Sequence, residues 1–227
     1  MQCQYCQNAD ISQSLIGDEM EAEALADVFL RLQDLGCHNI NLVSPTHVLL
    51  PILSALHIAA ARGLRLPLVY NTGGFDSLEA LQLLDGVVDI YMPDMKYASA
   101  QTARFDSKSP NYPQVNQAAV KEMHRQAGDL QLDSQGIALR GLLVRHLVLP
   151  HNLAGTEQIV HFLADEISKD TYLNLMDQYH PAYKAARYEK LNRRITPAEF
   201  SAALQSAREA GLRRLAGFSG NTTLNRG

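Results

Sequence analysis

The sequence predicts an α/β fold built on a parallel sheet. Short apolar segments of strand length alternate along the chain with segments of helical periodicity, which is typical of strands covered by helices. Right-handed crossovers curl five such strands in one direction, as in a partial (β/α) barrel. No G-x-G-x-x-G follows the first expected strand, which disfavours a dinucleotide-binding doubly wound sheet. Periodicity alone leaves barrel and open sheet as alternatives.

In the N-terminal half, the first expected helix covers residues 18–35. Its apolar residues recur at three- and four-residue steps, and Asp18 with Glu21 resembles a capping box. Gly36 is placed to end this helix. The elements expected next are a strand at 40–43, a helix at 49–60, a strand at 66–70, a short helix at 77–84 and a strand at 87–92.

In the C-terminal half, a long polar stretch follows Pro93 and carries no expected element before the turn residues at 109–113. Thr196, Pro197 and Glu199 supply a cap, a first-turn proline and an acidic residue for the last helix. The remaining expected elements are a helix at 115–126, a hairpin at 130–141, a strand at 142–149, a helix at 156–167, a final strand at 172–176 and a helix ending at Gly211.

Composition narrows the class of protein. The 227 residues form one large domain or two small ones, and the net charge of −4 gives no general attraction for nucleic acid or an anionic membrane. The longest apolar runs are only strand-length, so we expect no transmembrane helix, and the first residues lack the pattern of a signal peptide. Three cysteines, an odd number, disfavour a secreted disulfide scaffold and favour a reducing cytoplasm.

Cys3 and Cys6 form a C-x-x-C motif at the start of the chain. This spacing serves metal or iron–sulfur ligation, or thiol–disulfide exchange. A thioredoxin-type dithiol would follow a strand and open a helix, but almost nothing precedes Cys3. A structural zinc site needs two more closely spaced ligands, and the sequence has no second C-x-x-C or H-x3-H pair. Cys37 is the other cysteine.

The segment Tyr5-Cys6-Gln7-Asn8 resembles the end of the C-x3-C-x2-C cluster loop of radical S-adenosylmethionine (SAM) enzymes. Its form is similar to that of pyruvate formate-lyase activating enzymes. The first cysteine of that pattern would fall two residues before Met1. The resemblance implies one domain over 1–227, with a cluster loop at 1–17 and a C-terminal helix and tail at 196–227. It also implies a partial (β/α)6 TIM-like barrel of parallel strands, whose first strand is missing from this sequence.

Polar residues after two of the expected strands extend the resemblance. The turn Asn71-Thr72-Gly73-Gly74 is similar to the family's Asp-Thr-Asn-Gly turn, which implies a contact of Asn71 with the methionine or ribose part of SAM. Paired glycines at 73 and 74 allow close approach of a ligand, but a plain tight turn is the alternative. Asp94 and Lys96 resemble the family's Asp-x-Lys pair near SAM, and a structural ion pair is the alternative.

Arg145 lies inside the apolar segment 142–149, where a permanent charge is costly unless a carboxylate pairs with it. That carboxylate belongs either to the protein or to SAM. The run 144–150 resembles the family's Ile-Arg-Tyr-Val-Val-Val-Pro-Gly strand, with Arg145 in the place of its arginine, which implies the SAM carboxylate. His146 is expected to be a core histidine. The resemblance also implies that His180 lies near SAM, with a surface loop as the alternative, and that Tyr5 packs against or hydrogen-bonds the adenine.

The resemblance implies a [4Fe–4S] cluster held by Cys3, Cys6 and an upstream cysteine, with reductive cleavage of SAM and hydrogen abstraction from a substrate. Lys96 and Arg145 are the implied catalytic residues. Implied partners are a glycyl-radical enzyme or other protein substrate and a flavodoxin- or ferredoxin-type electron donor, without nucleic acid or membrane. The alternatives are a non-catalytic or truncated cluster- or SAM-binding module acting through a partner, and a cluster-free barrel whose cysteines bind zinc across a dimer.

Overall fold

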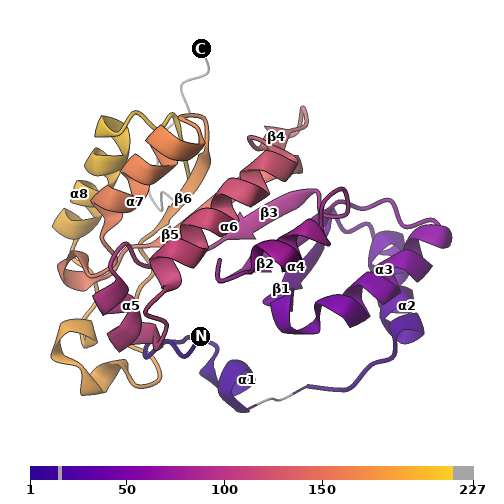
Figure 1. Ribbon diagram of the computed structural model, residues 1–227, viewed down its shortest axis with the longest axis horizontal. Coiled ribbons are helices and arrows are strands. Elements are labelled where there is room, and N and C mark those ends of the chain that lie inside the picture. Colours follow the sequence, from indigo (N-terminus) through magenta and orange to yellow (C-terminus); the bar gives the residue numbers. More distant parts are fainter. Residues whose placement is uncertain (15–16, 217–227) are drawn as a thin grey trace.

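The computed structural model describes residues 1–14 and 17–216, and its centre is a twisted parallel sheet (Figure 1). The neighbouring strands on the main path are β1, β2, β3, β5, β6 and β7, and each neighbouring pair is parallel. Strands that follow one another in chain order, joined by helical crossovers, make a partial TIM-like barrel, which confirms the predicted fold class. The strands are β1 (Ile40–Val43), β2 (Leu68–Thr72), β3 (Ile90–Pro93), β4 (Gln131–Leu132), β5 (Ala138–Leu147), β6 (Tyr172–Met176) and β7 (Arg214–Ala216).

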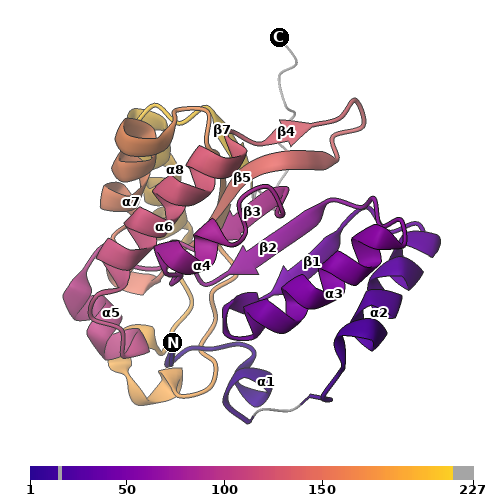
Figure 2. The ribbon, with the colours of Figure 1, turned by 45° about the vertical axis from the view of Figure 1, so that its right-hand side comes forward.

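Helices cover the outside of the sheet. Figure 2 shows α3, α4 and α6 running along the strands, with α2 packed on α3. Among the described residues, no helix has the length and apolar character that a membrane crossing requires. The helices are α1 (Ala9–Ser14), α2 (Ala22–Asp34), α3 (Leu49–Ala61), α4 (Leu78–Gln82), α5 (Ala100–Ser107), α6 (Tyr112–Ala127), α7 (Thr156–Phe162) and α8 (Pro197–Glu209).

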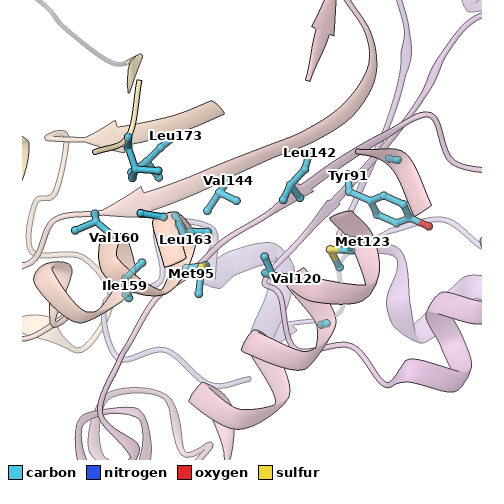
Figure 3. Close-up of a cluster of buried hydrophobic side chains, with 14 of the residues drawn as sticks. Tyr91, Met95, Val120, Met123, Leu142, Val144, Ile159, Val160, Leu163 and Leu173 are labelled. Carbon is cyan, nitrogen blue, oxygen red and sulfur yellow. The ribbon is translucent and has the colours of Figure 1, made fainter. Parts of the chain in front are cut away.

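The largest core cluster lies between the sheet and its helices (Figure 3). Leu142 and Val144 on β5 alternate with residues of the other face, and both are completely buried. Val120 and Met123 on α6 are three residues apart, so they share the helix face that packs into this cluster. Burying each such side chain stabilises the fold by about 1.5–3 kcal/mol relative to an exposed position.

The predicted capping box of the first long helix is wrong. Helix α2 begins at Ala22, and its N-cap residue Glu21 has extended backbone and makes no side-chain capping hydrogen bond. Asp18 therefore lies before the helix. Strand β2 also ends two residues later than predicted, at Thr72, because Asn71 and Thr72 still pair with the neighbouring strands.

The sequence-based prediction missed two elements that follow Pro93, a helix and a strand. Helix α5 lies in the polar stretch after Pro93, and its start is capped by Ser99, whose side chain accepts a hydrogen bond from the Thr102 amide. Strand β7 follows α8 and pairs with β6, so β6 is not the final strand. Both elements lack a long apolar pattern, and tertiary contacts rather than periodicity define them.

The hairpin and the last helix are confirmed with small shifts. Strand β4 pairs antiparallel with the first part of β5, so β5 begins at Ala138 rather than at residue 142. Thr196 and Glu199 form the capping box of α8, with Pro197 in its first turn. The helix ends at Glu209, two residues before Gly211.

Candidate functional site

The N-terminal loop that carries the two nearby cysteines is bound to the end of α5 (Figure 1). The Gln2 amide donates to the Ser107 carbonyl at 3.0 Å, and the Gln4 amide donates to the Asp106 carbonyl at 2.8 Å. On the other side, the Lys184 amide donates to the Gln4 carbonyl at 2.9 Å. The loop is therefore fixed between α5 and the segment after β6, next to the carboxyl ends of the strands.

A cavity of about 240 Å³ lies between this loop and the ends of β3, β5 and β6. It brings together six of the residues that the sequence nominated, from parts of the chain up to 142 positions apart (Cys3 to Arg145). This is the position where parallel α/β folds place their ligand sites. The lining residues are Cys3, Tyr5, Cys6, Gln7, Asn8, Asp94, Lys96, Arg145, Leu147, Met176 and Gln178.

Asp94 bridges the two basic residues of the cavity. Its Oδ2 accepts a hydrogen bond from Lys96 Nζ at 2.6 Å, and its Oδ1 lies 2.7 Å from Arg145 Nη2. The pairing is set by the backbone, because the Met95 amide donates to the Arg145 carbonyl at 2.8 Å. Two cations against one carboxylate leave one positive charge, which suits a ligand that carries a carboxylate.

The ammonium group of Lys96 stays charged in this setting. Burial opposes its charged form, but the carboxylate of Asp94 and the sulfur of Cys3 outweigh that effect and raise the pKa of Lys96 above its ordinary value. The same interaction makes Lys96 a permanent positive charge beside Cys3.

Arg145 has an unused donor. Its Nε is buried and has no hydrogen-bond partner among the described residues, and the Asp94 Oδ1 beside it lacks hydrogen-bond alignment despite the short distance. A buried donor without a partner costs about 1–3 kcal/mol. Because Arg145 lines the cavity, an acceptor on a bound molecule would satisfy this N–H.

His146, the neighbour of Arg145 on β5, points to the opposite side and is completely buried. Its Nδ1 lies 2.6 Å from the Met95 carbonyl, so Nδ1 carries the proton, and Nε2 accepts from Thr156 Oγ1 at 2.9 Å. Burial lowers the pKa of His146 to about 4. The prediction of a satisfied core histidine is confirmed.

The two sulfurs have different surroundings. Cys3 Sγ accepts a hydrogen bond from Ser107 Oγ at 3.0 Å, whereas Cys6 Sγ lies 3.4 Å from Ser12 Oγ in an exposed position. Both cysteines are free thiols and are partly exposed. Within the described ranges, no group of three or more His, Cys, Asp or Glu side chains is arranged to hold a metal ion.

Tyr5 lines the cavity, but its hydroxyl is directed into the protein. The ring is 6% exposed and makes edge contacts with Tyr97 and Tyr179. The hydroxyl forms a 2.6 Å hydrogen bond with the Tyr97 hydroxyl. Burial, together with the nearby Tyr97, raises the pKa of Tyr5 well above its ordinary value, so the phenol is neutral.

The glycine turn after β2 lies beside the cavity without lining it. The Asn71 side chain is buried. Gly74 has a φ of +71°, and a Cβ there would lie 2.3 Å from the Asp94 carbonyl oxygen. The glycine therefore permits close approach of two strand ends of the protein itself. A Cβ at Gly73 would contact Lys96, at 3.8 Å from its Cε.

His180 also lies next to the cavity. Its Nδ1 is 3.3 Å from Gln7 Nε2, and Gln7 is one of the lining residues. The histidine thus contacts the N-terminal loop through Gln7.

Several site residues were not identified from the sequence. Ser107 and Tyr97 contact Cys3 and Tyr5, and the Tyr112 hydroxyl accepts from the Lys96 amide at 3.0 Å. The sequence carries no signal for Ser107, because α5 itself escaped prediction. Ser99, as a potential N-cap, was the one usable indication of that helix.

Comparisons with known proteins agree with this architecture. The chain is 31% identical over 220 residues to an uncharacterized protein of Methanocaldococcus jannaschii, a match that includes 92% of this chain. The chain spans 60% of the length of that curated relative. No family model matches the chain. A crystal structure of a domain of pyruvate-formate lyase-activating enzyme from Bacteroides vulgatus superposes with a TM-score of 0.54, covering 79% of this chain and 99% of that domain, at 10% identity. This similarity identifies a shared fold.

Proposed function

We propose that this chain is the barrel domain of a radical SAM enzyme of the activating-enzyme type. The observation that carries the proposal is the common cavity of Cys3, Cys6 and Arg145, in which the buried Arg145 Nε has no acceptor from residues 1–14 and 17–216. The fold shared with a pyruvate-formate lyase-activating enzyme domain supports it.

The described residues supply two thiols for a cluster and a buried donor for SAM. The thiolates of Cys3 and Cys6 are suitable ligands for iron, and the C-x3-C-x2-C pattern that they resemble has three such thiolates. Arg145 Nε suits an oxygen of the SAM carboxylate, and Lys96 reinforces it with a positive charge. When bound, a reduced [4Fe–4S] cluster would supply one-electron reducing chemistry toward the SAM sulfonium.

The protein's own part in this chemistry is to bind SAM, to orient it and to shield it from water. Asp94 fixes both basic side chains at 2.6 and 2.7 Å, so neither has to reorganise when a carboxylate arrives. Leu147 and Met176 give the cavity an apolar wall, which favours exclusion of water from a reactive radical. Asn71, Gly73, Gly74 and His180 stay proposed contacts to SAM at the margin of the cavity.

The substrate we propose is a glycine in a partner glycyl-radical enzyme or another protein, with a flavodoxin- or ferredoxin-type electron donor. A rival from another class is a non-catalytic module that binds a partner. The specific observation in its favour is that the described residues offer two clustered thiols and no third metal-ligating side chain beside them.

Anaerobic reconstitution with iron and sulfide tests the proposal. We expect about four irons per chain, with a broad visible absorption that disappears in Cys3→Ser and Cys6→Ser. Cys37→Ser is the matched control, because Cys37 lies outside the cavity, and its iron content should equal that of the parent. Absence of iron from the parent chain would favour the non-catalytic module.

The coding DNA provides an independent test. We expect the upstream sequence to read in frame, with a cysteine codon two positions before Met1. A stop codon at or after that position would contradict the three-thiolate ligand set.

A further inference from the structure

We propose that the hydroxyl groups of Tyr5, Tyr97 and Ser107 form a directed hydrogen-bond chain that stabilises negative charge on the Cys3 sulfur. This inference deepens the proposed function and rests on it. In this proposal Ser107 and Tyr97 are positioning residues that act on the Cys3 sulfur. Tyr5 belongs to the same hydrogen-bond chain and does not serve as a contact for adenine.

The chain is continuous and closed to solvent. The Tyr5 and Tyr97 hydroxyls are 2.6 Å apart, the Tyr97 hydroxyl lies 2.6 Å from Ser107 Oγ, and Ser107 Oγ donates to Cys3 Sγ at 3.0 Å. Tyr5, Tyr97 and Ser107 are 6%, 2% and 0% exposed. Water therefore has little access to any of these bonds except at the sulfur itself.

The proton positions follow from counting donors. The Tyr5 hydroxyl has Tyr97 as its one hydrogen-bond partner in the part of the chain that the structure describes. If Tyr5 donates, Tyr97 donates to Ser107, Ser107 donates to Cys3, and every hydroxyl proton has an acceptor. If the direction is reversed, Cys3 must donate and the buried Tyr5 proton has no acceptor. The satisfied arrangement is the one in which the sulfur only accepts, as a thiolate or metal-bound thiolate does.

The tyrosines are suited to remain donors. Burial raises the pKa of Tyr97 well above its ordinary value, so its hydroxyl keeps the proton that it donates in the chain.

The environment of Cys6 provides an internal contrast. Its neighbour Ser12 Oγ is 3.4 Å away and exposed, whereas the donor to Cys3, Ser107, is 0% exposed. The buried hydroxyl chain of Tyr5, Tyr97 and Ser107 ends at the Cys3 sulfur. Hydrogen bonds to cluster sulfur withdraw negative charge and favour the reduced state, which raises the reduction potential.

Two probes test the inference on the whole chain. In the iron-reconstituted protein, Ser107→Ala should shift the cluster potential downward in an EPR-monitored titration, Tyr97→Phe by a smaller amount and Tyr5→Phe by the least. In the protein loaded with Co²⁺ alone, Ser107→Ala should move the thiolate-to-cobalt charge-transfer band to lower energy, because the sulfur lone pair loses its hydrogen bond. Ser12→Ala beside Cys6 is the matched control, with a smaller shift in both measurements.

The outcomes separate this inference from the proposed function. If the parent binds no iron but Ser107→Ala still shifts the cobalt band, the hydrogen-bond chain to Cys3 is supported and the proposed cluster function is contradicted. Equal potentials and equal cobalt bands in Ser107→Ala and the parent overturn the inference, as do equal shifts in Ser107→Ala and Ser12→Ala. Failure to bind either metal overturns both. Circular dichroism and thermal midpoints of each variant establish that it is folded.

Discussion

At the scale of single residues, Arg145 combines an ion pair inside the protein with a buried donor that faces the cavity. The sequence predicted that this buried charge needs a carboxylate, and the structure supplies Asp94 at 2.7 Å. The recorded contact is made by Nη2, and Nε is buried with no acceptor among the described residues. The residue is thus a structural partner of Asp94 that still has a free N–H within that part of the chain.

We predict that Arg145→Ala leaves the iron content unchanged but lowers 5′-deoxyadenosine formation by at least about tenfold, because a hydrogen bond to a charged group contributes about 1.5–3 kcal/mol. Arg65→Ala, an exposed arginine, is the control. Production is measured anaerobically by chromatography. Unchanged 5′-deoxyadenosine in Arg145→Ala would rule out the proposed contact.

His146 makes stability depend on pH. Its pKa is about 4 in the folded protein against 6.5 ordinarily, so between these values the unfolded chain binds a proton that the folded chain does not. The contribution of neutral His146 is complete above pH 6.5 and is lost as pH falls toward 4. The total is on the order of 3 kcal/mol.

Urea denaturation at pH 7 and pH 4.5 measures this effect. His146→Asn keeps a donor for the Met95 carbonyl but does not titrate, so it should lose less stability over this interval than the parent does. Burial raises the pKa of Asp106 to about 6, so this residue makes the folded protein more stable as the pH falls. Both proteins contain Asp106, so its effect on the free energy of unfolding cancels in the comparison. Equal losses in the two proteins would contradict the assignment.

At the scale of elements, the sequence predicted a helix end correctly where residues close together in the chain form it. The capping box of α8 needs only Thr196 and Glu199, and both were identified from their spacing. The similar pair Asp18 and Glu21 failed, because no helix begins there. Helix α5 escaped because its residues are mostly polar, and its stability comes from contacts with the N-terminal loop and α6.

Thr196→Ala should lower the free energy of unfolding by about 1 kcal/mol, because the Glu199 amide loses its side-chain acceptor. Thr196→Ser keeps the hydroxyl and should stay near the parent. Chemical denaturation measures both. Glu199→Ala should be more destabilising, since this carboxylate also accepts from Arg193 and the His151 amide. Equal stabilities of the alanine and serine variants at position 196 would contradict the capping role.

At the scale of the whole molecule, strand β1 forms an edge of the described sheet. Its recorded partner is β2, and Val43 at its end is 65% exposed. An apolar edge of this kind promotes pairing between chains. We therefore expect concentration-dependent association of this chain.

Sedimentation velocity at increasing concentration measures the association. Val43→Lys places a charge on the edge and should reduce it. Leu35→Lys is the matched control, because Leu35 is an equally apolar residue, 70% exposed, that lies at the end of α2 rather than on the edge. A parent chain that stays monomeric, or equal effects of the two lysines, would contradict edge pairing.

By itself the sequence determined the α/β class, most strands, the capping box of α8 and the need of Arg145 for a carboxylate, because apolar periodicity, end signals and charge cost are local properties. Its resemblance to the activating enzymes indicated the curl of the sheet and the other candidate residues of the cavity. The tertiary structure alone decided that Cys3 and Arg145 share one cavity while Asn71 and Gly74 line none of it. It also decided that a serine of an unpredicted helix donates to Cys3, because contacts between residues 104 positions apart depend on how the strands and helices pack.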